Sequence, residues 1–130
     1  MINKNIRIVK NKENSNDVTE EELYKAPDGY FTEIVVSDIL ETSKNQGVIE
    51  AVCNKVRKNG SLVLQGVDGH DLCRNIYYGK IKIEETSDYF GEIERMNSLN
   101  SLKTMFTSMG WNVAFTGLKN GRYFIEVKKP

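Results

Sequence analysis

Polar side chains that can take part in chemistry gather at two places in the sequence, each directly after an apolar run. The first place holds Asp38 and Glu41, and the second holds Asp68, His70 and Asp71. A neutral imidazole flanked by carboxylates suits a general base, and it also suits a metal ligand. One histidine with two nearby acids does not define a metal site, so we predict a ligand-binding site without a metal.

Each of these side chains also has a structural interpretation, and the residues alone leave that alternative open. Asp38 and Glu41 can be acids of a loop or of the first turn of a helix, where the helix dipole favours negative charge. His70 can be an ordinary histidine of a surface loop. The choice depends on where the chain places the two groups relative to each other.

The elements that must position these residues form a strand–helix–strand unit. The segment 31–37 is continuously apolar, which favours a strand of a parallel sheet that is covered on both faces. Apolar residues at spacings of one, three and four predict a helix from about Ser43, ended by the Asn-Gly pair at 59 and 60. The segment 61–67 then returns to the sheet. A right-handed crossover between parallel strands brings both strand ends to one edge.

The N-terminal part predicts a strand from Ile2 to Val9, because apolar and polar residues alternate there. The stretch 17–22 has an N-cap candidate followed by acidic residues, which predicts a short helix that ends at about Lys25. In the middle of the chain, we interpret 68–88 as a loop with at most a short helix near Leu72. An extended stretch over 80–84 follows in this interpretation.

The C-terminal part gives clearer signals. Asn97 or Ser98 caps a helix whose apolar residues recur at three- and four-residue steps, and Gly110 ends it. Two β-rich runs then flank Asn120-Gly121, which is the strongest short-range signal for a β-hairpin.

Composition limits the class of protein. The 130 residues fit a single domain over 1–130, and 18 basic residues balance 18 acidic ones. No global charge draws the chain to nucleic acid or to a membrane surface, and no segment approaches the roughly 20 apolar residues that span a bilayer. Cys53 and Cys73 are not part of a CxxC motif, so we expect free thiols and a cytoplasmic location.

The unit 31–67 resembles the second half of a class I S-adenosylmethionine (SAM)-dependent methyltransferase. The helix that begins near Ser98 and closes with Gly110-Trp111, together with the hairpin, is similar to the end of that fold. The resemblance implies an α/β, three-layer Rossmann-like mixed sheet of about five strands with a C-terminal antiparallel hairpin. It also implies that Asp38 and Glu41 line the mouth of the cofactor and substrate site.

The cofactor half of that family is not visible in the sequence. The family places a glycine-rich loop after its first strand, where missing side chains let the backbone approach the cofactor. Here Lys10 to Asn14 follow the first predicted strand, and no glycine precedes Gly29. About 30 residues are also too few for the strands and helices that precede the family's fourth strand.

Two hypotheses follow. The first is a truncated methyltransferase-like domain that has lost cofactor binding and acts as a binding or structural module. Its partner is a protein or a small molecule, and it forms a homo-oligomer that covers a sheet edge. The second is a small SAM-dependent methyltransferase with an atypical cofactor site made by Asp38, Glu41 and the loop 68–71. If the chain binds a small ligand, we expect Asp38, Asp68 and His70 to reach one pocket at the ends of the two central strands.

Overall fold

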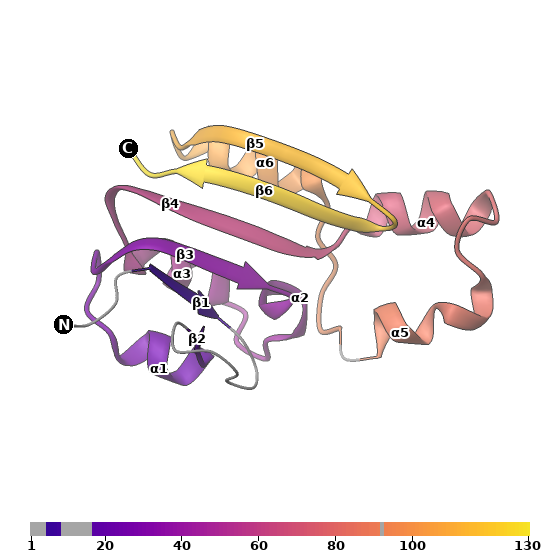
Figure 1. Ribbon diagram of the computed structural model, residues 1–130, viewed down its shortest axis with the longest axis horizontal. Coiled ribbons are helices and arrows are strands. Elements are labelled where there is room, and N and C mark those ends of the chain that lie inside the picture. Colours follow the sequence, from indigo (N-terminus) through magenta and orange to yellow (C-terminus); the bar gives the residue numbers. More distant parts are fainter. Residues whose placement is uncertain (1–4, 9–16, 92) are drawn as a thin grey trace.

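A mixed β-sheet forms the centre of the chain (Figure 1). The computed structural model describes residues 5–8, 17–91 and 93–130. Within these ranges the sheet has the strands β1 (Asn5–Ile8), β2 (Asp17–Val18), β3 (Phe31–Ser37), β4 (Val56–Val67), β5 (Asn112–Lys119) and β6 (Arg122–Lys128). The helices are α1 (Glu20–Lys25), α2 (Ile39–Thr42), α3 (Val48–Lys55), α4 (Gly69–Tyr77), α5 (Ser87–Phe90) and α6 (Leu99–Ser108), with a 3₁₀ turn η1 (Ile83–Glu85).

The strand order is β2-β1-β3-β4-β6-β5. β3 and β4 pair in parallel at the centre, with Ile34 opposite Leu62 and Val36 opposite Leu64. β6 pairs antiparallel with both β4 and β5. The predicted central parallel pair, the mixed sheet and the C-terminal hairpin are therefore confirmed. The described sheet has six strands where we expected about five, because Asp17–Val18 forms a short edge strand. The short helix predicted to end at about Lys25 is confirmed as α1, with Thr19 as its N-cap.

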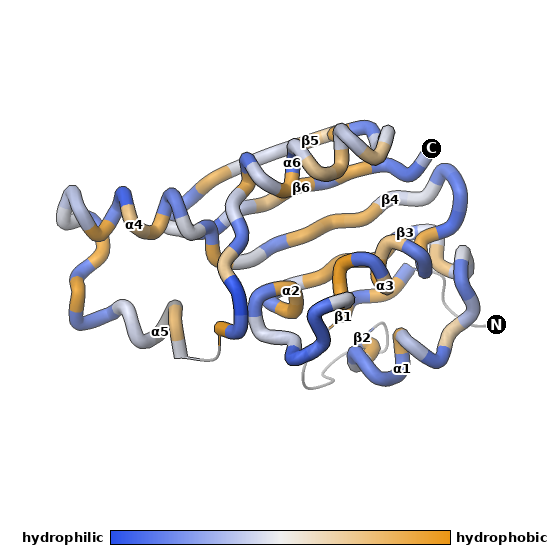
Figure 2. Tube along the Cα trace, turned by 180° about the vertical axis from the view of Figure 1, so that it is seen from behind, coloured by the Kyte–Doolittle hydropathy of each residue, from blue (hydrophilic) through white to orange (hydrophobic). Residues whose placement is uncertain are grey.

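The main core lies on one face of this sheet. Alternate residues of the central strands are completely buried, among them Ile34, Val36, Leu62 and Leu64. Helices α3 and α6 cover this face: they lie behind the sheet in Figure 1 and in front of it in Figure 2. On the other face Val35 stays partly exposed, and a second buried cluster joins Val67 at the end of β4 to Leu72 of α4.

The helix after β3 differs from the sequence prediction at both of its ends. Instead of one helix from about Ser43 to the Asn-Gly pair, the chain forms the short α2, then α3, which ends at Lys55. Asn59 adopts a positive φ of 66° inside the irregular start of β4. A Cβ atom at Gly60 would lie 2.7 Å from the carbonyl oxygen of Thr32. The pair thus permits a bulge against β3 and does not end the helix.

The middle segment contains more helix than predicted. α4 has nine residues where we expected at most a short helix near Leu72, and η1 replaces part of the extended stretch expected over 80–84. The signal that the sequence interpretation missed is Asp68, whose side chain caps α4. Helices α4 and α5 project from the end of the sheet (Figure 1), and we name the segment 69–91 the arm.

The C-terminal elements agree with the prediction. Ser98 caps α6 in a capping box with Ser101, and Gly110 follows the helix with a φ of 83°. Asn120 and Gly121 both have positive φ angles, 52° and 77°, as a type I′ hairpin turn requires. Trp111 packs beside Phe106, with 5.2 Å between the ring centroids, and thereby joins the hairpin to α6.

No described helix is long and apolar enough to cross a membrane.

We predict that Leu64→Ala lowers the free energy of unfolding by about 2 to 5 kcal/mol, because it leaves a cavity under the central strand. Leu64 is completely buried. The matched control is Glu50→Ala on the exposed side of α3, which should change the free energy of unfolding by less than about 0.5 kcal/mol. Urea unfolding of the two variants beside the wild type measures both. Equal losses would show that the core lies elsewhere.

Candidate functional site

The carboxyl ends of β3 and β4 meet the first residues of β6, and the predicted site residues lie around this junction. Asp38 follows β3 directly and has a left-handed φ of 64°, which is uncommon for a residue with a side chain. Its backbone N–H donates to the carbonyl of Gln65 at 2.9 Å, which ties it to β4. Its carboxylate pairs with the guanidinium of Arg122 at 2.8 Å, and both side chains are over 40% exposed.

Glu41 lies in α2 and is 1% exposed. Its Oε2 accepts hydrogen bonds from the side-chain amide of Asn97 at 2.6 Å and from the hydroxyl of Tyr123 at 2.9 Å. Its Oε1 has no hydrogen-bond partner. Burial raises the pKa of Glu41, and the nearby Asp38 adds to the rise, while the two hydrogen bonds oppose it. The carboxyl of Glu41 therefore favours its neutral form more than an exposed glutamate does.

The space for this carboxyl is made by Gly66 of β4. A Cβ atom at Gly66 would lie 1.9 Å from Oε1 of Glu41 and 2.9 Å from the hydroxyl of Tyr123. No side chain fits there without moving both groups. Burial, together with the neighbouring Glu41, also raises the pKa of Tyr123. The Tyr123 phenol is thus a donor to Glu41 and is poorly suited to act as a base.

The segment 94–97 fixes α2 from outside. The backbone N–H groups of Glu94 and Arg95 donate to the carbonyl of Glu41 at 2.7 and 3.2 Å. The guanidinium of Arg95 donates to the carbonyls of Leu40 and Ser43, the latter at 2.7 Å. Because α2 has only four residues, these bonds satisfy carbonyls that a longer helix would satisfy internally.

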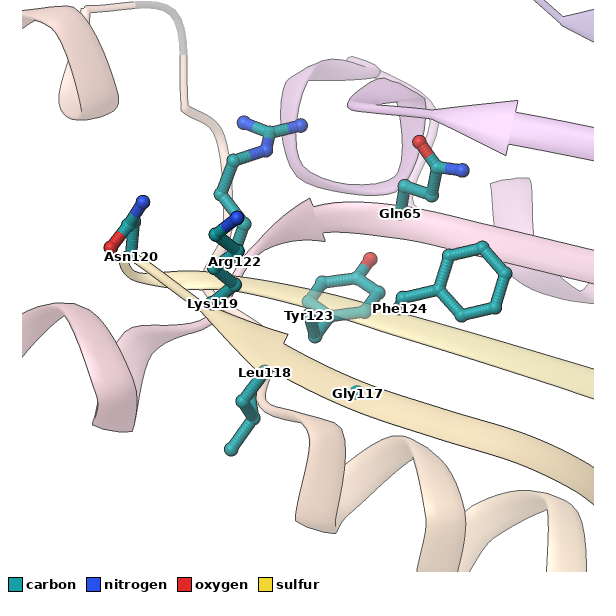
Figure 3. Close-up of a pocket in the computed structure, with 8 residues that line it drawn as sticks. All are labelled: Gln65, Gly117, Leu118, Lys119, Asn120, Arg122, Tyr123 and Phe124. Atoms are coloured by element: carbon teal, nitrogen blue, oxygen red, sulfur yellow. The ribbon is translucent and has the colours of Figure 1, made fainter.

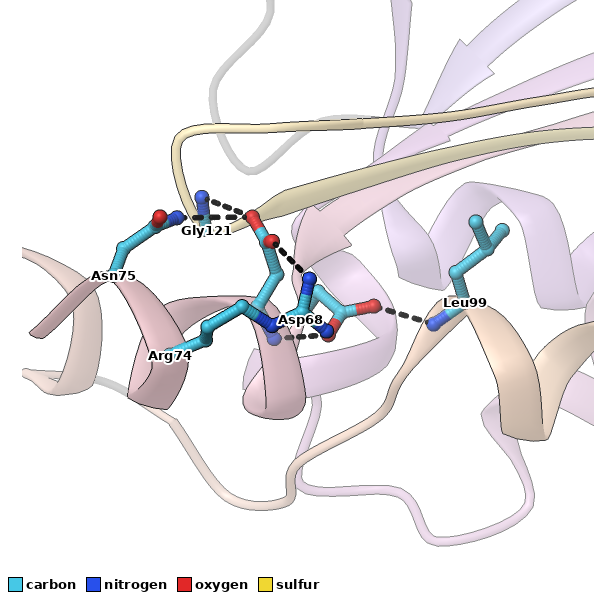
Figure 4. A network of polar contacts seen from close by, with 6 residues as sticks. Asp68, Arg74, Asn75, Leu99 and Gly121 are labelled. Carbon is cyan, nitrogen blue, oxygen red and sulfur yellow. Dashed lines mark hydrogen bonds and ion pairs between the residues drawn. The ribbon is translucent and has the colours of Figure 1, made fainter. Parts of the chain in front are cut away.

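Asp68 is 2% exposed and caps two helices at once (Figure 4). Its Oδ1 accepts from the backbone N–H of Asp71 at 2.8 Å in the first turn of α4. Its Oδ2 accepts, at 2.5 Å, from the backbone N–H of Leu99, which is the first residue of α6. The backbone N–H of Asp68 donates to the carbonyl of Gly121 at 2.9 Å. The residue is therefore a structural connection between β4, two helices and the hairpin turn.

Asp71 also has a structural role. Its Oδ2 accepts from the backbone N–H of Gly121 at 2.8 Å and from the side-chain amide of Asn75 at 3.1 Å (Figure 4). A partly exposed ion pair with Arg74, at 3.8 Å, completes its contacts. The carboxylate holds the turn of the β5–β6 hairpin against α4.

His70 is exposed and lies one residue after the start of α4. It lines a hollow of about 320 Å³ together with Asp68, Arg74, Leu99 and Lys103. The structure thus brings Asp68 and His70 to one hollow, and Asp38 is not among the residues that line it. Instead, Asp38 pairs with Arg122, which lines a second hollow of about 440 Å³ with Gln65 and Phe124 (Figure 3).

The sequence analysis missed four residues of this junction: Arg95, Asn97, Arg122 and Tyr123. Nothing in the local sequence marks Arg95 or Asn97, because their partners are more than 50 residues away along the chain. Arg122 and Tyr123 had a usable signal. They follow the Asn-Gly turn and are the first residues of β6. Because β6 pairs antiparallel with β4, its first residues lie beside the carboxyl end of β4.

Among the described residues, no three His, Cys, Asp or Glu side chains lie close enough together to hold a metal ion.

Several solved structures with a similar arrangement of elements are SAM-dependent methyltransferases. A SAM-dependent methyltransferase from Thermotoga maritima, a possible histamine N-methyltransferase, is 16% identical with a TM-score of 0.57, over 88% of this chain and 63% of that one. One from Mesorhizobium loti is 10% identical with a TM-score of 0.57, over 91% of this chain and 72% of that one. The protein of a DhpI–SAM–HEP complex is 16% identical with a TM-score of 0.54, over 88% of this chain and 57% of that one. The chain has a methyltransferase fold.

At these identities the likeness establishes the fold of this methyltransferase-like domain. No protein-family model and no curated protein sequence matches the chain. The domain spans less than two thirds of the length of the Thermotoga maritima protein and of the DhpI chain. The expected resemblance to class I methyltransferases is confirmed for the fold, including the parallel centre and the antiparallel β6 between β4 and β5.

We predict that Glu41→Gln changes how stability depends on pH. Because burial raises the pKa of Glu41 above the value of an unfolded chain, the folded state holds its proton more tightly. The stability that this supplies is complete below the unfolded pKa and is lost as the pH rises through the folded pKa. Glutamine mimics the neutral acid and does not titrate. As the pH rises above about 4.5, the free energy of unfolding of Glu41→Gln should therefore increase relative to that of the wild type.

Urea unfolding at a series of pH values from acid to neutral measures this difference. Parallel pH profiles for the two proteins would contradict a raised pKa at Glu41.

We predict that Asp68→Ala lowers the free energy of unfolding by about 2 kcal/mol, since each of its two helix caps contributes about 1 kcal/mol. Asp68→Asn keeps one acceptor oxygen and should lose about half as much. His70→Ala, an exposed neighbour, is the control and should leave stability nearly unchanged. Thermal and urea unfolding compare the three variants. If His70→Ala costs as much as Asp68→Ala, the double cap is not the source of the stability.

Proposed function

We propose that this chain is a reduced methyltransferase-like domain that does not use SAM and works as a binding or structural module. The observation that supports the proposal is that most carboxylates at the carboxyl ends of β3 and β4 make hydrogen bonds within the fold. Asp68 caps two helices, Asp71 holds the hairpin turn, and Glu41 is enclosed by Asn97 and Tyr123. These carboxylates serve the fold, so few polar groups are left to recognise a nucleoside.

The sequence gives independent support. In the methyltransferases that the sequence resembles, a glycine-rich loop follows the first strand and lets the backbone approach the cofactor. In this chain β1 ends at Ile8, and no glycine precedes Gly29. A segment without glycine lacks the residue type by which that loop makes room for the cofactor.

A small SAM-dependent methyltransferase with an altered site is the second candidate, and Asp38 favours it. Its left-handed backbone is the kind of local strain that functional sites retain. Its carboxylate stays accessible and adjoins the hollow beside Arg122. In this candidate Asp38 would bind the cofactor's donor groups or act as a base, and Glu41 would support it from below.

We further propose that the module binds a protein partner in the cytoplasm. Both cysteines are free, and Cys73 is exposed, as a reducing compartment permits. The exposed apolar side chains of the arm, Tyr77, Tyr78 and Ile83, suit protein contacts better than contacts with a polar small molecule.

Calorimetric titration of the chain with SAM and with S-adenosylhomocysteine tests the two candidates. We expect no saturable heat up to millimolar ligand. A methyltransferase of established activity, titrated in the same buffer, serves as the positive control. Micromolar binding that Asp38→Asn weakens tenfold or more, while Glu50→Ala on the exposed side of α3 does not, would overturn the proposal and support the methyltransferase.

A further inference from the structure

The outer strand β5 has a free side. One side pairs with β6, and no described strand pairs with the other. Phe115 and Leu118 of this strand are 59% and 45% exposed. Two hollows run along the same edge, one of about 360 Å³ beside Val113 and Thr116, and one of about 320 Å³ that reaches Leu118.

The hairpin turn determines which backbone groups of β5 point outward. In a two-residue type I′ hairpin, the residues that flank the turn, here Lys119 and Arg122, form a hydrogen-bonded pair. Alternation along an antiparallel ladder then directs the N–H and C=O groups of Gly117 toward β6. Those of Thr116 and Leu118 point away from β6, to the free side.

This edge has few of the features that block further pairing. Sheet edges are protected by charged side chains, proline or bulges. From Asn112 to Leu118 the strand has no charged residue and no proline. Its one bulge, at Ala114, precedes the regular register that runs from Phe115 to Lys119. The regular part is long enough to pair with another strand.

We propose that a second copy of the chain pairs with this edge, β5 antiparallel to β5, around a twofold axis that passes through Gly117. In this register the outward groups of Thr116 meet those of Leu118 in the second copy, so both sets of hydrogen bonds form. Gly117 lies opposite itself. The two six-stranded sheets become one continuous sheet.

The side chains favour this register over its neighbours. It places Lys119 opposite Phe115 of the second copy, where the ammonium group can lie over the ring. An axis at Leu118 would leave Thr116 facing the turn, and an axis at Thr116 would pair Leu118 with the bulged Ala114. The partner is a second copy because the uncharged stretch 112–118 is complementary to itself, and the charged Lys119 lies opposite Phe115, so no like charges meet across the axis.

Disulfide formation across the axis tests the register. Gly117→Cys, in a Cys73→Ser background, places two thiols on neighbouring strands at a separation that a disulfide can span. The position has room for a Cβ atom, whose nearest neighbours would lie 3.9 and 4.0 Å away. The matched control is Lys119→Cys in the same background. Its two copies would be about 13 Å apart along the strands, too far to join.

We expect Gly117→Cys to form a covalent dimer under mild oxidation at least about tenfold faster than Lys119→Cys. Equal rates, or a faster reaction of Lys119→Cys, would overturn the register. Sedimentation of the wild type should show a dimer, and Thr116→Pro, which removes an outward N–H donor, should shift it to monomer where Thr116→Ala does not. Circular dichroism verifies the folding of each variant.

A wild type that stays monomeric at its highest soluble concentration would overturn the dimer. The two experiments have separate readouts: sedimentation and cross-linking report the dimer, and the titration reports the binding of SAM. If the chain is a monomer and binds no SAM, the proposed module stands and the proposed dimer fails. If the chain is a dimer and binds SAM, the proposed dimer stands and the proposed module fails.

Discussion

The buried carboxylate of Asp68 is the constraint on which the organisation of the domain depends. A carboxylate taken out of water must find donors, and two helix N-termini supply them. One side chain thereby fixes where α4 leaves the sheet and where α6 returns to it. The backbone of the same residue reaches Gly121, so the hairpin is positioned by the same few atoms.

Glu41 is a second buried carboxyl group, but unlike Asp68 it does not have a hydrogen-bond donor for each oxygen. Its carboxyl is buried next to a glycine and between two donors, yet one oxygen is without a partner. An unmet buried acceptor is costly for a charged group and much less so for a neutral one. Burial is the main cause of the raised pKa of Glu41, and the oxygen without a partner receives no hydrogen bond that would offset it.

The parts of the fold that the sequence predicted are those set by short-range chemistry. The periodic apolar residues of α6, its Ser98 cap, and the Asn120-Gly121 turn each act within a few residues, and all three are confirmed. The extent of α3 was predicted wrongly, because the Asn-Gly pair at 59 and 60 has the same left-handed preference at a helix end as in a bulge. Only contact with Thr32 of β3 distinguishes the two.

For the candidate site, the sequence could indicate an edge of the sheet but not the contacts that the residues make there. The crossover rule places Asp38 and Asp68 near one edge, but sequence spacing contains no information on Arg95 or Asn97, which come from a distant segment. These distant residues donate the hydrogen bonds that enclose Glu41. In the same way, the N–H groups of Leu99 and Gly121 bind the carboxylates of Asp68 and Asp71.

The arm leaves and rejoins the body of the domain at nearly the same point. The N–H of Gly69 donates to the carbonyl of Asn97 at 2.8 Å, so the two ends of the inserted segment are held together whatever lies between them. The entropy of closing such a loop grows only slowly with its length. The exposed stretch 82–85 of the arm is therefore the place where this chain can gain or lose residues at small thermodynamic cost, because it lies beyond the buried contacts of α4.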